Sequence, residues 1–197
     1  MPKKKSVKKT AAEFRDAVKS IRAFLGAQDT LQTNKSYRQW MYDYAIIWLY
    51  MEFEYLVLNA LVGAINNDTT TLASRTGIKF PKHLTDEVCE YIIAGNGYFD
   101  FRGRSGLIDA IKDFVPDGHY LLKTVRDAKY TAALDRLVAL RNFAAHGSAS
   151  AKARAKTAVK SKKIASSGAW LSTQGRFNAI ADSLEALATE IETGAPY

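Results

Sequence analysis

Hydrophobic residues recur every three or four positions over three long stretches of this chain. The stretches are Thr10–Phe24, Asp127–His146 and Ser172–Thr193. Their apolar stripes consist of Phe14, Val18, Ile21 and Leu25; of Tyr130, Leu134, Leu137 and Leu140; and of Phe177, Ile180, Leu184, Leu187 and Ile191. Because an α-helix turns once every 3.6 residues, this spacing brings each stripe to one face. The pattern predicts three amphipathic helices, with Gly26 ending the first.

A fourth stretch, Tyr44–Ile65, is apolar on nearly every face. We expect it to form most of a long helix that is capped by Asn34 or Ser36. Glu52 and Glu54 lie near its centre, and two charges there offset the gain from placing the apolar side chains in a bilayer. A helix that is apolar nearly all round is enclosed by other elements. The sequence therefore predicts a buried central helix and no membrane span.

Short segments bounded by turn residues lie between the long stretches. We expect a short helix over Leu84–Ala94 with Thr85 as its cap, and another over Ser105–Phe114. We also expect a less regular segment over Asp117–Val125 and a polar loop, with at most one short turn, over Thr69–Pro81. The chain of 197 residues holds only four prolines, and it is long enough to bury one core. These observations predict an all-α fold, a single antiparallel helical bundle around the long apolar helix.

Basic residues give the chain a formal net charge of +8 and gather in two places. Residues 1–9 are basic and lack a following apolar segment, so we interpret them as a disordered tail before a domain over residues 10–197, and not as a secretory signal. Residues 149–165 form a basic insertion that is an exposed helix or a flexible loop. Its candidate RNA-binding residues are Lys152, Arg154, Lys156, Lys160, Lys162 and Lys163. The charge favours an anionic partner, most commonly nucleic acid.

The single cysteine, Cys89, lies in an apolar helical pattern. One cysteine excludes an intrachain disulfide and a cysteine-based zinc site. Carboxylates and histidines form no recognisable metal motif in the sequence. We therefore expect a protein of the reducing cytoplasm, with no metal and no other cofactor.

The most informative string, RNFAAH, runs from Arg141 to His146 and ends a predicted helix. Arginine binds phosphate as a permanently charged fork, and histidine exchanges protons near neutral pH. Five residue steps leave the two side chains about 140° apart around a helix. They can still converge on one phosphodiester, because both are long enough and the helix end frays.

The same string also has a purely structural interpretation. His146 would be a cation at a helix C-terminus, and Gly147 suits the left-handed position that ends a helix. Arg141 would then pair with a carboxylate such as Asp135 or Asp182. Spacing alone does not separate the two interpretations.

Four features, in order, resemble the HEPN superfamily, particularly its RiboL-PSP-HEPN-like kind. A long apolar helix carries a Glu beside an aromatic residue, as in Met51–Tyr55, and a loop similar to Gly97–Phe101 follows. Then comes a helix ending in an Arg-x4-His string, here Arg141–His146, and a final long helix. The resemblance covers residues 37–192.

This resemblance implies a fold, an assembly and an activity. HEPN domains are helical bundles, and members of the superfamily include metal-independent ribonucleases and toxins. It also implies a symmetric homodimer, which would bring two histidines and two arginines to one cleft. Some HEPN toxins carry a tyrosine two residues after the histidine, which a nucleotidyltransferase antitoxin modifies. Ser148 stands there in this chain, so we do not expect that mode of neutralisation.

RNA cleavage assigns roles to the residues of the string. RNA supplies its own nucleophile, the 2′-hydroxyl, so the enzyme must provide a base, an acid and a cation for the crowded phosphorane. His146 is the candidate base or acid, Arg141 the candidate cation, and Asn142 the candidate group that positions the phosphate. Glu52 and Glu54 are candidates to line the site.

Two function classes follow from the sequence. The leading hypothesis is a metal-independent endoribonuclease of the toxin or phage-defence type, with RNA as substrate and an antitoxin or defence-system protein as partner. The alternative is a non-catalytic helical module that binds RNA or protein. In that case the basic segments do the binding, and Arg141 and His146 are structural.

Overall fold

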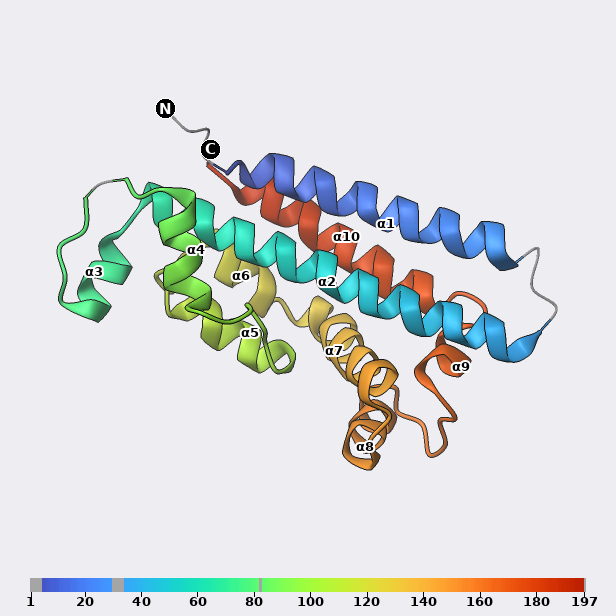
Figure 1. Cartoon of the computed structure of the whole chain (residues 1–197). Helices are drawn as coiled ribbons and strands as arrows, with labels where there is room; N and C mark the ends of the chain where they lie inside the picture. The colour runs from blue at the N-terminus through green and yellow to red at the C-terminus, as the bar shows by residue number, and fades with distance from the viewer. Residues whose placement is uncertain (1–4, 30–33, 82, 197) are drawn as a thin grey trace.

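The computed structural model describes residues 5–29, 34–81 and 83–196 of the chain. Within these residues the secondary structure is entirely helical. The three long helices are α1 (Val7–Asp29), α2 (Lys35–Asn67) and α10 (Arg176–Gly194), which lie side by side (Figure 1). The shorter elements are α3 (Thr70–Thr76), α4 (Asp86–Ala94), α5 (Gly103–Lys112), α6 (Tyr120–Arg126), the 3-10 turn η1 (Ala128–Tyr130), α7 (Thr131–His146), α8 (Ala149–Ala158) and α9 (Ser167–Leu171). The predicted all-α class is confirmed.

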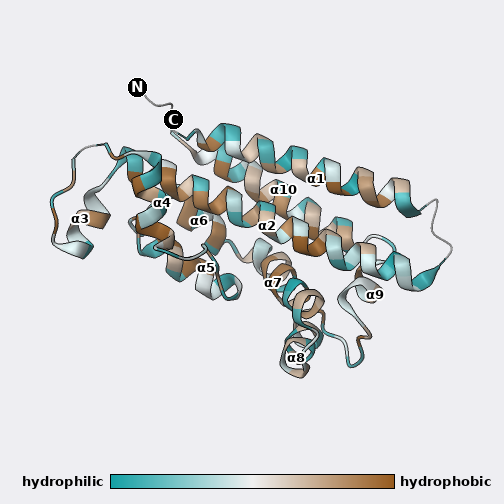
Figure 2. Cartoon of the chain, in the orientation of Figure 1, coloured by the Kyte–Doolittle hydropathy of each residue, from teal (hydrophilic) through white to brown (hydrophobic). Residues whose placement is uncertain are grey.

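Helix α2 is the centre of the fold. It contacts α1, α4, α7, α9 and α10, and hydrophobic residues recur along its length (Figure 2). Leu49, Phe53 and Val57 are each 0% exposed. By length and composition α2 is apolar enough to cross a membrane, but 56% of its most apolar window is buried inside the protein. The prediction of a long, apolar central helix is confirmed.

Helices α1 and α10 cover one side of α2 and run antiparallel to each other (Figure 1). Ion pairs between the two helices fix their register. Arg15 contacts Glu192 at 2.7 Å near one end of the pair, and Arg22 contacts Glu185 at 2.8 Å further along. The apolar stripes predicted for both helices are buried against α2 and against each other. The antiparallel packing predicted for these long helices is therefore present.

The N-terminal boundary differs from the prediction of a disordered tail over residues 1–9. Helix α1 begins at Val7, whose side chain is 0% exposed. The backbone amide of Lys5 donates to Asp86 at 2.9 Å, and its ammonium group pairs with Glu90. The tail prediction is thus wrong for residues 5–9, because Val7 and this ion pair attach them to α2 and α4. Residues 1–4 lie outside the described residues.

Predicted helix ends agree with the structure where a side chain caps the helix. Asn34 caps α2, and its Oδ1 accepts from the backbone N of Ser36 at 2.9 Å. Thr85 caps α4 in the same way through Val88. Gly26, by contrast, does not end α1, which continues to Asp29. Glycine tolerates a helical interior when neighbouring turns are packed.

The basic insertion begins as helix α8 and packs against α7. Ala151, Ala155, Val159 and Ile164 are all less than 9% exposed. The segment therefore carries more apolar surface than its lysines suggested. The nitrogen Nε of Arg136 donates to the carbonyl of Ala158 at 3.4 Å, so the two helices run antiparallel. Between α8 and α10 lies α9, which the sequence analysis did not predict.

Helix α9 sits so close to α2 that only glycine fits at residue 168. The amide of Gly168 donates to Oδ1 of Asp43 at 2.6 Å. A Cβ at this position would lie 1.8 Å from the carbonyl oxygen of Gln39. Nearby, the hydroxyl of Ser167 donates to the carbonyl of Leu140 at 2.7 Å. Helix α9 therefore ties α2 to the C-terminal half of α7.

We expect Gly168→Ala to lower the free energy of unfolding by about 1–3 kcal/mol, the usual cost of forcing atoms into a packed site. The measurement is urea unfolding followed by circular dichroism. Gly26→Ala is the matched control, since a Cβ there meets nothing within 4 Å. That control should be stabilised by about 0.5–1 kcal/mol. Equal stability of the two variants would contradict the close approach of α9 to α2.

Candidate functional site

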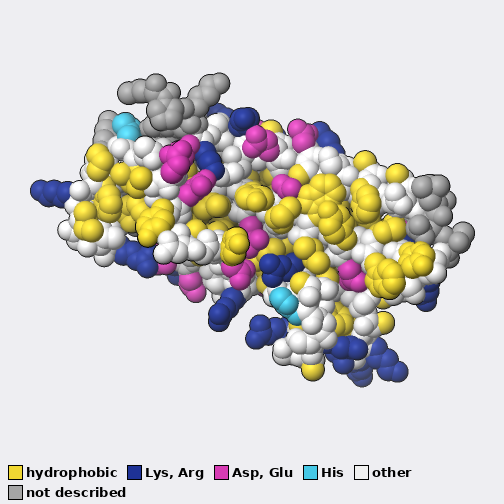
Figure 3. Space-filling view, in the orientation of Figure 1, with side chains coloured by type: hydrophobic (Ala, Val, Ile, Leu, Met, Phe, Trp, Pro, Cys, Tyr) yellow, Lys and Arg dark blue, Asp and Glu magenta, His cyan; other side chains and the backbone are white. Residues whose placement is uncertain are grey.

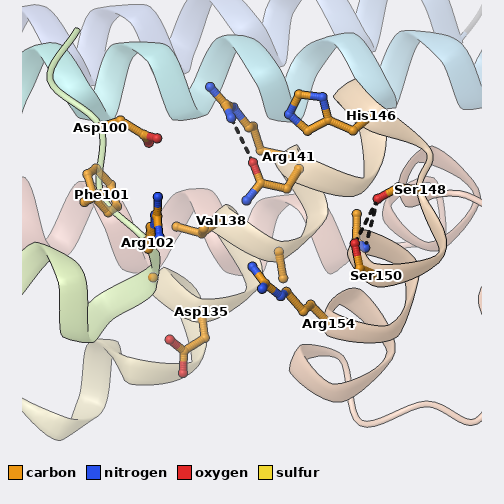
Figure 4. A pocket seen from close by; sticks show the side chains of 14 residues that line it. Asp100, Phe101, Arg102, Asp135, Val138, Arg141, His146, Ser148, Ser150 and Arg154 are labelled. Carbon is orange, nitrogen blue, oxygen red and sulfur yellow. Dashed lines mark hydrogen bonds between the residues drawn. The ribbon is translucent and has the colours of Figure 1, made fainter. Parts of the chain in front are cut away.

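A cavity of about 520 Å³ opens where the end of α7, the start of α8 and the segment before α5 meet. Arg141, Asn142 and His146 all line it, although five residue steps separate the first from the last. Figure 4 shows Arg141 and His146 at the rim of the cavity that faces α2. The three residues of the candidate catalytic string thus share one concave site.

Arg141 is held by an aromatic ring and an amide. Its guanidinium lies 4.4 Å from the centre of the Tyr50 ring, and its Nη1 donates to Oδ1 of Asn142 at 2.8 Å. Tyr50 is only 1% exposed, so this cation–π contact is shielded from water and is worth up to about 2 kcal/mol. The stacking fixes the direction of the guanidinium.

The structural interpretation of Arg141 offered a pairing with a carboxylate such as Asp135 or Asp182. Asp182 pairs instead with Arg22 on α1, and Asp135 lines the cavity without a salt bridge to Arg141. Within the described residues Arg141 forms no salt bridge. Its positive charge is thus oriented by Tyr50 but left without a contacting carboxylate.

His146 is the last residue of α7, and its side chain is exposed to solvent. The helix ends at Gly147, whose φ of 59° lies in the left-handed region and turns the chain into α8. This reversal creates the cavity, because α8 returns along α7 and faces its last turn. His146 therefore lies at the C-terminus of a helix and in the candidate site at once.

A carboxylate of α2 lies within electrostatic reach of Arg141. Burial raises the pKa of Glu54 from its ordinary value of 4.5 to about 7; a hydrogen bond with Tyr50 and the charge of Arg141 oppose this rise, and Asp100 adds to it. The hydroxyl of Tyr50 also donates to Oδ1 of Asp100 at 2.7 Å. Glu54 therefore changes charge close to neutral pH.

The two glutamates of α2 have different surroundings. Glu54 lines a second cavity of about 550 Å³, together with Met51, Tyr55 and Tyr91. Glu52 accepts a hydrogen bond from the indole Nε1 of Trp48 at 2.9 Å and lines neither cavity. Of the two carboxylates, Glu54 is the one placed beside the Arg141 site.

Of the candidate RNA-binding residues of the basic insertion, only one lines the cavity. Arg154 lines the 520 Å³ cavity. The ammonium of Lys152 lies 6.0 Å from the centre of the Phe143 ring, next to the site. Lys156, Lys160, Lys162 and Lys163 are absent from the lining of the cavity. Of the basic residues of α8, Arg154 thus lines the cavity and Lys152 lies near it, whereas Lys160, Lys162 and Lys163 follow the end of the helix.

Sequence analysis missed two contributors to the site. Tyr50 looked like one more apolar residue of α2, and Arg102 looked like one basic residue among many. The packing of α2 against α7 brings Tyr50 to Arg141, and the tertiary structure places Arg102 in the cavity that Arg141 lines. No local sequence signal distinguishes either residue.

No protein-family model, no curated protein and no solved structure matches the chain. The HEPN resemblance therefore remains a prediction from the residues quoted above. In the part of the chain that the structure describes, no group of three or more His, Cys, Asp or Glu side chains is placed to hold a metal ion.

The raised pKa of Glu54 makes the stability of the protein depend on pH. Between about pH 4.5 and pH 7 the folded state binds more protons at Glu54 than the unfolded state does, so the contribution of this residue to stability falls as pH rises. We expect the free energy of unfolding of Glu54→Gln, relative to that of the wild type, to increase by about 2–3 kcal/mol from pH 4.5 to pH 8. Urea unfolding at both pH values measures this gain.

Glu52→Gln controls for the loss of a charge from the same helix. A difference between wild type and Glu54→Gln that stays constant from pH 4.5 to pH 8 would contradict the raised pKa.

Proposed function

We propose that this protein is a metal-independent endoribonuclease of the HEPN type, with a toxin or phage-defence role in the cytoplasm. One observation carries the proposal. A histidine and an oriented arginine without a salt bridge, His146 and Arg141, line the same open cavity. They supply two of the three groups that the cleavage of RNA requires, a cation and a base or acid.

The proposed reaction uses the nucleophile of the substrate. A base removes the proton of the 2′-hydroxyl, and the 2′-oxygen forms a bond to phosphorus. The bond from phosphorus to the 5′-oxygen breaks, and an acid protonates the departing oxygen. The products are a 2′,3′-cyclic phosphate and a 5′-hydroxyl. Arg141 stabilises the charge that develops on the phosphorane oxygens, and Asn142 hydrogen-bonds Arg141 and holds its orientation.

The reaction needs both a base and an acid, whereas His146 is the single histidine lining the cavity. Glu54 is a second titratable group nearby, with a pKa of about 7. In the proposed enzyme a second copy of the chain supplies the other histidine. A two-fold axis beside α2 would bring both copies of His146 into one cleft.

An apolar face of α2 supports this dimer. Tyr37, Trp40, Tyr44, Met51 and Tyr55 are each more than 40% exposed. Their spacing of three, four or seven residues places them along one stripe of the helix. Hydrophobic side chains gather over α2 on the face drawn in Figure 3, with basic groups beside them. An aromatic-rich apolar stripe is typical of a surface that another protein covers.

His146→Ala should lower RNA cleavage by about 10²–10⁴-fold, the usual contribution of a positioned acid or base. Arg141→Ala should lower it by about 10²–10³-fold through loss of transition-state stabilisation. Cleavage of a labelled RNA in the presence of EDTA measures both effects, and chemical analysis of the ends identifies the cyclic phosphate.

His83→Ala is the matched control, because His83 lies in the segment between α3 and α4 and does not line the cavity. Activity that EDTA abolishes, or that survives in His146→Ala, would overturn the proposed mechanism. RNA binding without any cleavage by the wild type would favour the alternative, a non-catalytic binding module.

Met51→Glu should convert the proposed dimer to a monomer and abolish cleavage in parallel. A charge placed in the centre of the apolar stripe would lose its water in the interface, which costs several kcal/mol. Sedimentation equilibrium measures the mass, and Ile78→Glu is the control, since Ile78 is an exposed hydrophobic residue away from α2. A wild-type protein that cleaves RNA as a monomer would contradict the shared cleft.

A further inference from the structure

The arginines of this chain fall into two groups. Most are engaged by the protein itself: Arg15, Arg22, Arg38, Arg75 and Arg126 form salt bridges, and Arg104, Arg136, Arg141 and Arg176 donate hydrogen bonds to carbonyl or amide oxygens. Arg102 and Arg154 form no salt bridge and no side-chain hydrogen bond within the described residues, and both are exposed. Both also line the 520 Å³ cavity that holds Arg141 and His146.

The two arginines come from separate parts of the fold. Arg102 immediately precedes α5, and Arg154 lies in the middle of α8. Figure 4 shows them on opposite sides of Val138, with Arg141 and His146 above at the rim. Helix α7 forms the wall between them, so the tertiary structure determines that they share one cavity.

Carboxylates within the cavity do not neutralise these arginines. Asp100 and Asp135 also line it, but Asp100 accepts the hydroxyl of Tyr50 at 2.7 Å and neither aspartate forms a salt bridge with an arginine. Guanidinium groups that share a concave surface attract an anion strongly, because each presents a planar fork that matches two phosphate oxygens. The cavity is therefore suited to a phosphate group beyond the one at Arg141.

The volume of the cavity suits a bound nucleotide better than a single bound ion. At about 520 Å³ the cavity falls in the range of sites that hold a whole small organic ligand. The hydroxyls of Ser148 and Ser150, 3.2 Å apart, lie on the same wall and offer hydrogen bonds to a sugar or a phosphate. A single inorganic phosphate would leave most of this space to water.

We propose that Arg102 and Arg154 bind the phosphate next to the scissile one on the same single RNA strand. This inference rests on the proposed function, which places the scissile phosphate at Arg141 and His146. The cavity then forms a subsite for the flanking nucleotide. Because the contacts are to phosphate and sugar, the subsite holds the strand in register and adds little sequence preference.

Binding at a flanking phosphate acts equally on the bound substrate and on the transition state. Removing it raises KM and leaves kcat unchanged, whereas removing a group that acts in the transition state lowers kcat. The double variant Arg102→Gln/Arg154→Gln should therefore raise KM by about 30- to 100-fold at low salt. Arg141→Gln should lower kcat instead.

The matched control removes the same charge elsewhere. Lys112 lies at the far end of α5 and Lys123 lies in α6; both are exposed, and neither lines the cavity. Lys112→Gln/Lys123→Gln therefore has the net charge of the double arginine variant. The control pair should keep the KM of the wild type within about threefold, since distant exposed charges are screened.

A binding measurement separates this inference from the proposed cleavage. In a His146→Ala background, the double arginine variant should bind a short single-stranded RNA with a salt slope lower by about 1.4 units, which corresponds to two lost phosphate contacts at 0.7 each. RNA carrying one uncharged methylphosphonate linkage beside the cleavage position should bind more weakly to the His146→Ala protein. It should bind the double arginine variant as well as unmodified RNA does.

The outcomes assign failure to one proposal or the other. Cleavage by the wild type together with an unchanged KM in the double arginine variant would overturn the subsite and leave the ribonuclease intact. The subsite would also be overturned if the double arginine variant lost the binding of inorganic phosphate but bound RNA as tightly as the protein with both arginines does. That result would favour a site for a free anion. Absence of cleavage in the wild type, with a salt slope that still depends on Arg102 and Arg154, would overturn the ribonuclease and retain the phosphate site.

Discussion

The enclosure of α2 is the constraint on which the rest of the fold depends. Over its central turns this helix is apolar on most faces, and each buried Leu, Ile or Phe side chain contributes about 1.5–3 kcal/mol when it leaves water. Helices α1 and α10 cover one side, and α4, α7 and α9 cover others. The face that remains uncovered carries exposed aromatic residues and adjoins the candidate site. Burial of α2 therefore positions both the cavity walls and the surface proposed for dimerisation.

The position of the Arg141 guanidinium follows from that packing. Helix α7 reaches α2 through the contact of Arg141 with Tyr50, and α9 secures the end of α7 through Ser167 and Leu140. Gly168 allows α9 to approach the backbone of α2. Contacts with α2 and α9 thus hold the C-terminal half of α7, from which the cavity residues Arg141, Asn142 and His146 project.

Two opposing effects act on the charge of Glu54 in α2. Burial disfavours a negative charge on Glu54, while Arg141 favours it. At neutral pH the carboxyl group is therefore close to its midpoint, and a bound phosphate would add negative charge that favours the protonated form. The protonation of Glu54 therefore depends on its burial, on the charge of Arg141 and on the charge of any ligand bound nearby, and it affects the stability of the protein.

The sequence by itself determined the elements whose signals are local. Periodic apolar stripes predicted α1, α7 and α10, and the caps at Asn34 and Thr85 marked the starts of α2 and α4. The Arg141 to His146 string was visible as a candidate because residue chemistry and spacing are written in the chain. Val7 was missed at the edge of a lysine-rich segment, since a single apolar residue has no periodicity to recognise.

Tertiary structure alone decided which distant side chains share the site. Glu52 and Glu54 are equivalent in sequence, but a two-residue step on a helix turns the side chain by about 200°, so one bonds Trp48 and the other lies near Arg141. The packing of Ala151 and Ala155 against the core placed Arg154 in the lining of the cavity, which the lysines of its segment do not join. Arg102, which immediately precedes α5, lines the same cavity as Arg154. Contacts between residues far apart in the chain arise from packing, and packing has no local signature.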